Sequence, residues 1–119
     1  MIYHTDELFD LNYTITNHWL VHFTYPWEAL PKLGEQIIAI GSRLPAEKFE
    51  MRGEHIWIAK TARVAASALL TAPCIIDEDA EVRHCAFIRG SVVIGKGAVI
   101  GNSCEIKNSI IFDGAEVPH

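Results

Sequence analysis

The sequence lacks a surplus of basic charge and any long apolar run. Its 119 residues contain 10 Lys and Arg against 15 Asp and Glu, and the formal net charge of −5 argues against nucleic acid as a partner. No apolar stretch approaches the length of a membrane span, and the N-terminus has no basic segment followed by an apolar one. We therefore expect a cytoplasmic protein of one domain that does not contact a membrane.

Cysteine is also scarce. The chain has three, an odd number, and Cys74 and Cys104 stand at positions where the repeat described below otherwise has small residues. We expect these two to be buried thiols that fill space as small apolar side chains, and not a disulfide pair. This usage again favours a reducing compartment.

What the chain does contain is an unbroken repeat of six residues. Every sixth residue is large and apolar, and the residue four places later is mostly small and never charged. This pairing is the hexapeptide-repeat signature of a parallel β-helix, whereas an antiparallel sheet of short strands would alternate with a period of two. The large positions are Ile58, Val64, Leu70, Ile76, Val82, Ile88, Ile94, Ile100, Ile106 and Phe112, and the small ones are Ala62, Ala68, Cys74, Ala80, Ala86, Val92, Ala98, Cys104 and Ile110.

The repeat predicts the architecture. Three hexads make one triangular coil, each hexad supplies one flat wall and one corner, and coils stack at about 4.8 Å so that backbone hydrogen bonds close between neighbours. Ten hexads amount to a little over three coils. The predicted fold class is therefore mainly β, a parallel β-helix. The glycines expected to let the chain turn at its corners are Gly90, Gly95, Gly97, Gly101 and Gly114.

Residues 1–55 are expected to form a helical N-terminal cap over the open end of the first coil, and residues 56–119 the β-helix. The clearest helix begins in residues 25–31, where Pro31 is tolerated in the first turn, and ends at Pro45. Residues 47–54 are predicted to be a polar connector. The helix presents an apolar face of Leu33, Ile37, Ile40 and Leu44, a shorter helix is expected from Thr5 to Asp10, and Asn12–Asn17 alternates like a strand.

The C-terminal end of the repeat has no expected cover. Nothing after His119 would shield the last coil, so we expect its strand edges and its apolar interior to be exposed. The chain is therefore expected to be a truncated form of a longer protein, or to oligomerise at that end.

Six histidines raise the question of a zinc site, because the γ-class carbonic anhydrases share this β-helix. A catalytic zinc needs three neutral imidazoles that converge on one ion. A close pair of histidines on adjacent hexads is absent, and His84 and His119 are 35 residues apart, nearly two coils. No metal site is therefore expected. Cys85 follows His84 directly, but adjacent strand residues point to opposite faces, so we expect this pair to be structural.

One stretch resembles a known family. It runs from Arg89-Gly90 through Ile100-Gly101-Asn102-Ser103-Cys104-Glu105-Ile106-Lys107-Asn108 to Pro118-His119. These residues and their spacings are similar to those of the left-handed β-helix acetyltransferase domain of the bifunctional N-acetylglucosamine-1-phosphate uridylyltransferase. The whole chain is also similar to stand-alone prokaryotic hexapeptide proteins described as sugar-phosphate acetyltransferases or nucleotidyltransferase-related proteins. A left-handed coil is implied by this resemblance alone.

The resemblance implies roles for three residues, and Glu105 is given a role because it lies two residues before Lys107. Arg89 and Lys107 match the cations that hold the sugar phosphate, His119 matches the catalytic base, and Glu105 would orient or neutralise Lys107. Arg offers a planar fork to phosphate, and the ordinary pKa of histidine suits proton transfer near neutral pH. Periodicity adds that Arg89 and Lys107, which are 18 residues apart, stack on the same wall one coil apart.

The expected function is that of the N-terminal part of a hexapeptide-repeat acyltransferase. The resemblance implies transfer of an acetyl group from acetyl-CoA to an amino-sugar phosphate such as glucosamine 1-phosphate, by a homotrimer that binds a sugar phosphate or nucleotide sugar. In the family, coils after the histidine help to form the acetyl-CoA site, so little activity is expected of this chain alone. Two alternatives stay open: a non-catalytic trimeric scaffold or sugar-nucleotide-binding module, and a γ-carbonic-anhydrase-like metalloenzyme.

Overall fold

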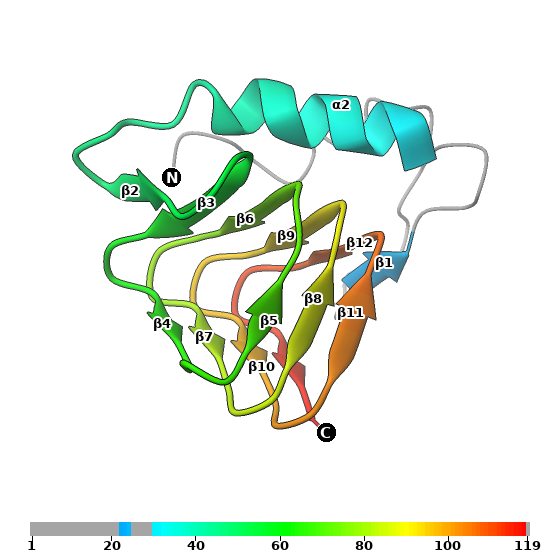
Figure 1. The fold of residues 1–119 in the computed structure, drawn as a ribbon. Helices are drawn as coiled ribbons and strands as arrows, with labels where there is room; N and C mark the ends of the chain where they lie inside the picture. The colour runs from blue at the N-terminus through cyan, green and yellow to red at the C-terminus, as the bar shows by residue number, and fades with distance from the viewer. Residues whose placement is uncertain (1–21, 25–29, 119) are drawn as a thin grey trace.

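A parallel β-helix of about three coils, with one helix along its side, makes up the described part of the chain (Figure 1). The computed structural model describes residues 22–24 and 30–118. The predicted fold class is confirmed. The expected helix at residues 5–10 and the strand-like segment 12–17 lie outside the described residues. No helix in the described part of the chain is long and apolar enough to cross a membrane.

Each coil contributes one short strand to each of three walls, and the strands of a wall are parallel. Sheet A contains β3 (Ile56–Ala59), β6 (Cys74–Ile76), β9 (Val92–Ile94) and β12 (Ser109–Ile111). Sheet B contains β4 (Arg63–Val64), β7 (Glu81–Val82), β10 (Val99–Ile100) and β13 (Glu116–Val117). Sheet C contains β5 (Leu69–Leu70), β8 (Phe87–Arg89) and β11 (Glu105–Lys107).

The predicted inward positions form the core between the three walls. Most of the large apolar residues at these positions are almost completely buried, and alanines and Cys74 fill the space beside them. Val64 and Leu70, in the first coil, are only partly buried. The buried residues that share this interior cluster include Ile58, Ile76, Val82, Ile88, Ile94, Ile100 and Ile106.

The repeat loses one residue at its last corner between sheets C and A. Lys107 pairs with Arg89, 18 residues earlier, but Ile111 pairs with Ile94, only 17 residues earlier. Ile111 is therefore the buried interior residue of the last coil, and Phe112 packs against the outer cluster instead.

The assignment of Phe112 and Ile110 to inward positions is therefore wrong. Ile110 also belongs to the outer cluster, beneath the helix. The reason for the error is that residues 110–112 are all large and apolar, so their composition does not reveal a shift of one place.

The corners of the second and later coils repeat a left-handed backbone residue. It recurs every six residues, and the interval falls to five once, where the repeat loses its residue. Gly97 and Gly114 stand at such positions, as expected, and Gly90 also has a positive φ, but Gly95 and Gly101 do not. The residues of this series are Asp79, Cys85, Ser91, Gly97, Ser103, Asn108 and Gly114.

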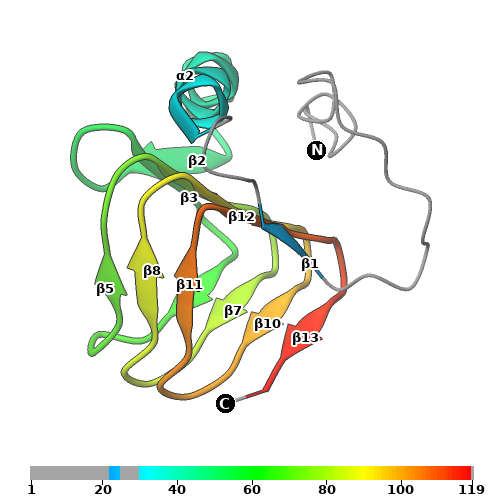
Figure 2. The same cartoon turned by 90° about the vertical axis from the view of Figure 1, so that its right-hand side faces the viewer.

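Helix α2 (Leu30–Gly41) covers the outer face of sheet A, with Pro31 in its first turn as predicted (Figure 2). Leu33, Ile37 and Ile40 are buried against the outward residues of sheet A, which include Trp57. A side chain at residue 41 would collide with Trp57, because a Cβ built on Gly41 lies 2.4 Å from its ring.

This position differs from the expected one, at the open end of the first coil. Because Leu33, Ile37 and Ile40 face sheet A, the helix lies along the side of the stack. The helix also ends at Gly41, before the proline at residue 45 that was predicted to end it.

Two strands from the N-terminal part of the chain border sheet A, and both are antiparallel to their neighbours. Strand β2 (Phe49–Met51) pairs with β3, so the prediction of a polar connector at residues 47–54 is wrong. Strand β1 (His22–Thr24) pairs with β12 of the last coil. The expectation of an exposed strand edge at the last coil is therefore wrong for sheet A, because that edge is covered by β1.

The one-residue shift predicts different costs for two neighbouring substitutions. Ile111→Ala should lower the free energy of unfolding by about 2 to 5 kcal/mol, because it empties part of the interior. Phe112→Ala should cost less, below about 2 kcal/mol, because this side chain is only partly buried on the outer surface of the coil. Denaturant unfolding of both variants measures the difference, and a larger cost at residue 112 would contradict the shifted register.

Candidate functional site

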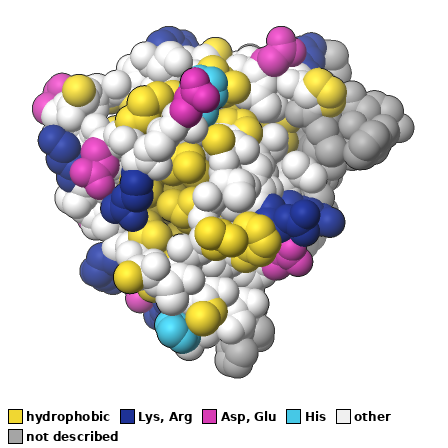
Figure 3. Space-filling view, viewed as in Figure 1, with side chains coloured by type: hydrophobic (Ala, Val, Ile, Leu, Met, Phe, Trp, Pro, Cys, Tyr) yellow, Lys and Arg dark blue, Asp and Glu magenta, His cyan; other side chains and the backbone are white. Residues whose placement is uncertain are grey.

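The outer face of sheet C carries the residues singled out by the family resemblance. Lys107 on β11 pairs in register with Arg89 on β8, so the predicted stacking of these two cations on one wall is confirmed. Glu105 stands beside Phe87 in the same register. Figure 3 shows cationic, acidic and hydrophobic side chains close together over the wall that faces the viewer. Residue 119, the predicted base, lies outside the described residues.

Glu105 binds Arg89 rather than Lys107. Arg89 Nη1 donates to Glu105 Oε2 at 2.7 Å, and the guanidinium lies 5.3 Å from the centroid of the Phe87 ring. The hydrogen bond from Arg89 is the main reason why the pKa of Glu105 is below its ordinary value, and Lys107 adds a smaller attraction. The sequence analysis assigned Glu105 to Lys107, whereas the hydrogen bond to this carboxylate comes from Arg89. The carboxylate holds the arginine in place and leaves the lysine outside the ion pair.

His84 has a hydroxyl partner that sequence reasoning missed. Ser67 Oγ lies 2.7 Å from His84 Nδ1 and also accepts a hydrogen bond from the Cys85 backbone N at 2.9 Å. Cys85 itself is exposed at a corner, in the left-handed conformation. The neighbours His84 and Cys85 are thus corner residues and not successive strand residues, and the described partner of the imidazole is a serine. The signal for this contact was the interval of 18 residues, one coil, between Ser67 and Cys85, the residue after His84.

The described residues give little support to thiol or metal chemistry. All three cysteines are free, and burial raises the pKa of Cys74 to about 12, so this thiol stays protonated at neutral pH. Among residues 22–24 and 30–118, no group of three His, Cys, Asp or Glu side chains is placed to hold a metal ion.

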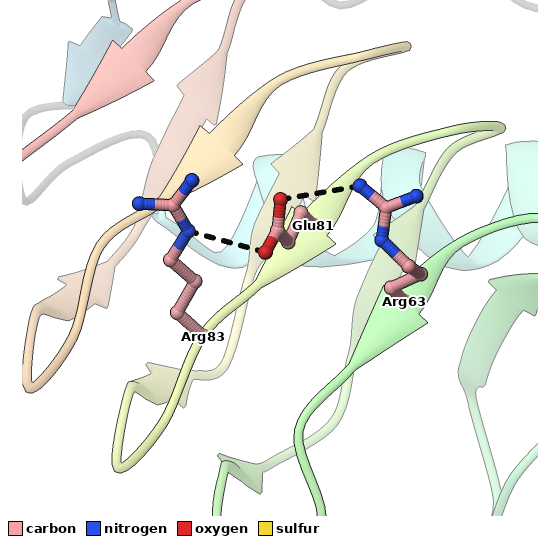
Figure 4. Close-up of polar contacts among 3 residues, drawn as sticks. All are labelled: Arg63, Glu81 and Arg83. Atoms are coloured by element: carbon pink, nitrogen blue, oxygen red, sulfur yellow. Dashed lines mark hydrogen bonds and ion pairs between the residues drawn. The ribbon is translucent and has the colours of Figure 1, made fainter.

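A second charged cluster lies on the outer face of sheet B, and the sequence analysis missed it (Figure 4). Glu81 accepts hydrogen bonds from Arg63 Nη2 at 3.3 Å and from Arg83 Nε at 3.1 Å. These two hydrogen bonds, the one from Arg83 first, lower the pKa of Glu81. The signal was present: Arg63 and Glu81 are one coil apart, and Glu81 and Arg83 are two residues apart on the same strand face.

A buried carboxylate occupies the corner after β6. Asp77 is completely buried, its Oδ1 accepts a hydrogen bond from the Glu78 backbone N at 2.7 Å, and its Oδ2 has no partner among the described residues. Burial is the main cause that raises the pKa of Asp77. The hydrogen bond from the Glu78 backbone lowers this pKa, and the negative charge of the nearby Asp113 raises it further. Asp77 is therefore a buried carboxyl group with one oxygen unsatisfied among the described residues.

One family comparison bears on these two surfaces. Residues 70–119, fewer than half of the chain, match the family model described as the GMPPB C-terminal domain. This part of the chain is similar to that domain. The domain is a hexapeptide-repeat, β-helix-like unit of nucleotidyltransferases. The matched segment includes Arg89, Glu105 and Lys107 on sheet C. It also includes Glu81 and Arg83 of the cluster on sheet B, but not Arg63. No curated protein and no solved structure matches the chain.

Substituting Asp77 should make folding less sensitive to pH. Because the folded protein binds this proton more tightly than the unfolded chain, the wild type loses stability as pH rises from the ordinary carboxyl range through the raised pKa. Asp77→Asn should therefore raise the free energy of unfolding at neutral pH by about 1 kcal/mol. The difference should shrink as the solution is acidified.

Thermal or denaturant unfolding at several pH values measures this effect. Asp79→Asn is the matched control, because Asp79 is exposed at the same corner and asparagine tolerates its left-handed backbone. If Asp77→Asn lowers the free energy of unfolding at neutral pH, the role given to the buried charge is contradicted. An equal increase in the control Asp79→Asn would contradict it as well.

Proposed function

We propose that sheet C carries the sugar-phosphate site of a hexapeptide-repeat acyltransferase. The observation that supports this proposal is the in-register stacking of Arg89 and Lys107 on one wall. Neighbouring strands are about 4.8 Å apart, so one phosphate group can contact a cation from each strand. Within this proposal, the acceptor is an amino-sugar phosphate such as glucosamine 1-phosphate.

The ion pair on sheet C prepares Arg89 for this role. Glu105 engages Nη1 alone, so the other nitrogens of the guanidinium remain available to phosphate oxygens. Stacking on Phe87 fixes the plane of the fork. Lys107 supplies the second positive charge, so the three charged groups together carry one net positive charge opposite the anion.

The proposed reaction assigns a further task to His119. The sugar amine attacks the thioester carbonyl, the carbon–sulfur bond breaks, the coenzyme A thiolate leaves, and a base takes the proton from the nitrogen. A neutral imidazole suits that last task near pH 7. Acetyl-CoA would supply the acetyl group. Arg89 and Lys107 account for one phosphate group of the acceptor, and little turnover is expected of this chain alone.

A second candidate function is supported by the family comparison. The match to a C-terminal domain of nucleotidyltransferases supports a nucleotidyltransferase-related module, and within this proposal that module is non-catalytic, binds a nucleotide sugar and assembles as a trimer. Leu69 is 57% exposed and lies beside Phe87 on sheet C, which leaves apolar surface for such an assembly. Native mass spectrometry tests the trimer. A zinc enzyme of the γ-carbonic-anhydrase kind would instead require stoichiometric zinc in the purified protein.

Removing either cation should weaken binding of glucosamine 1-phosphate. Arg89→Ala and Lys107→Ala should each lower the affinity at least about tenfold, because a charge-assisted hydrogen bond contributes about 1.5 to 3 kcal/mol. Stability should change little, since half of the Arg89 side chain is exposed. Titration calorimetry of the whole chain measures both variants beside Lys96→Ala, which removes an exposed cation from a corner outside this wall.

Detected turnover would distinguish the transferase from the non-catalytic module, although little is expected of this chain alone. Product should be followed by mass spectrometry, because an exposed Cys85 would react with thiol reagents. Formation of N-acetylated sugar phosphate that depends on Arg89 would establish the transferase. Binding affinity equal to that of the wild type in Arg89→Ala and Lys107→Ala would remove the basis for the site on sheet C.

A further inference from the structure

Sheet B carries a groove of about 610 Å³ on a wall different from that of the proposed sugar-phosphate site. This volume lies in the range of small-molecule sites. Three arginines line the groove with one carboxylate, in a protein whose formal net charge is −5. Its polar lining residues are Arg52, Arg63, Glu81, Arg83, His84 and Asn102.

Glu81 holds two of these arginines in place but accepts only one hydrogen bond from each guanidinium. Each of its oxygens takes one hydrogen bond, from Arg63 Nη2 and from Arg83 Nε (Figure 4). In the described part of the chain these two guanidiniums have no other acceptor, and the side chains of Arg63 and Arg83 are 75% and 50% exposed. Two preorganised cations around one carboxylate leave positive charge and several N–H groups directed to solvent.

His84 adds a donor to the same groove. The hydroxyl of Ser67 already accepts from the Cys85 amide, so its own proton is available to His84 Nδ1 at 2.7 Å. A neutral imidazole that accepts at Nδ1 carries its proton on Nε2, where it can donate. With the amide of Asn102, the groove therefore offers donors of two kinds beside its arginines.

The cationic groove continues into an apolar one. Arg83 and Asn102 also line a neighbouring cavity of about 240 Å³, whose other walls include Val99, Val117 and Pro118. A ligand with anionic groups at one end and a ring at the other could place its anionic groups in the groove and its ring in the neighbouring cavity. Inorganic phosphate would occupy only the groove with the arginines.

We infer that the outer face of sheet B binds the diphosphate of a nucleotide. Arg63 and Arg83 contact the phosphates, and the nucleoside lies against Val99 and Pro118. The inference depends on the groove and its ion pairs and is independent of the function proposed for sheet C.

Titration calorimetry of the whole chain with UDP, inorganic pyrophosphate and uridine, at fixed ionic strength, tests the inference. UDP should bind most tightly, pyrophosphate more weakly, and uridine weakest. Arg63→Ala and Arg83→Ala should each reduce the affinity for UDP at least about tenfold. Lys96→Ala removes an exposed cation outside the groove and should change the affinity for UDP less than about twofold.

Both arginines are exposed enough for the variants to fold, and a far-ultraviolet circular dichroism spectrum verifies this. Equal losses in the groove variants and in Lys96→Ala would overturn the inference, because they would indicate general attraction of anions. UDP binding no tighter than pyrophosphate would overturn the nucleotide as ligand. Selective loss in Arg63→Ala and Arg83→Ala, with UDP the tightest ligand, would establish the site.

Discussion

The in-register stacking of parallel coils determines most of this structure. Each wall closes its backbone hydrogen bonds between coils, so a residue lies beside the residue one coil earlier. That relation packs isoleucine on isoleucine in the interior. It also brings charged residues together on the outside, although they are distant in the chain. Both candidate sites result from this register, because Lys107 pairs with Arg89 and Glu81 pairs with Arg63.

On both outer walls a carboxylate holds arginines in place. Glu105 binds Arg89 on sheet C, and Glu81 binds Arg63 and Arg83 on sheet B. Ion pairs between exposed side chains contribute little to stability, so their main effect is on position. Each carboxylate reduces the rotational freedom of a long side chain while leaving part of its guanidinium open to solvent. The two walls thus share one arrangement, in which a carboxylate holds arginine side chains in place.

The sequence was sufficient for the parts of the fold that obey the six-residue period. Most of the interior residues and the stacking of Arg89 on Lys107 followed from counting. The missing residue near Asn108 did not, because Ile111 and Phe112 are equally apolar and either could fill the interior. The roles assigned to Arg89, Lys107 and His119 remain predictions.

The positions of the helix and of the two bordering strands were still harder to predict from the sequence. An apolar helix face shows that a surface is covered but does not say which one, and α2 covers a wall whose outward residues include Trp57, Ile75 and Val93. Strands β1 and β2 pair over long distances in the chain, without a periodic pattern. The cluster on sheet B could have been found by applying the one-coil interval to charged residues as well as to apolar ones.

The direction of the two bordering strands limits how the stack can associate. At both ends of sheet A the parallel order is interrupted, since β2 and β1 run against β3 and β12. Another coil or a second molecule could continue the parallel order on sheet A only by taking the place of one of these strands. On sheets B and C the described end strands are themselves members of the parallel order. Addition to the stack is therefore an exchange of partners on one wall and a simple extension on the other two.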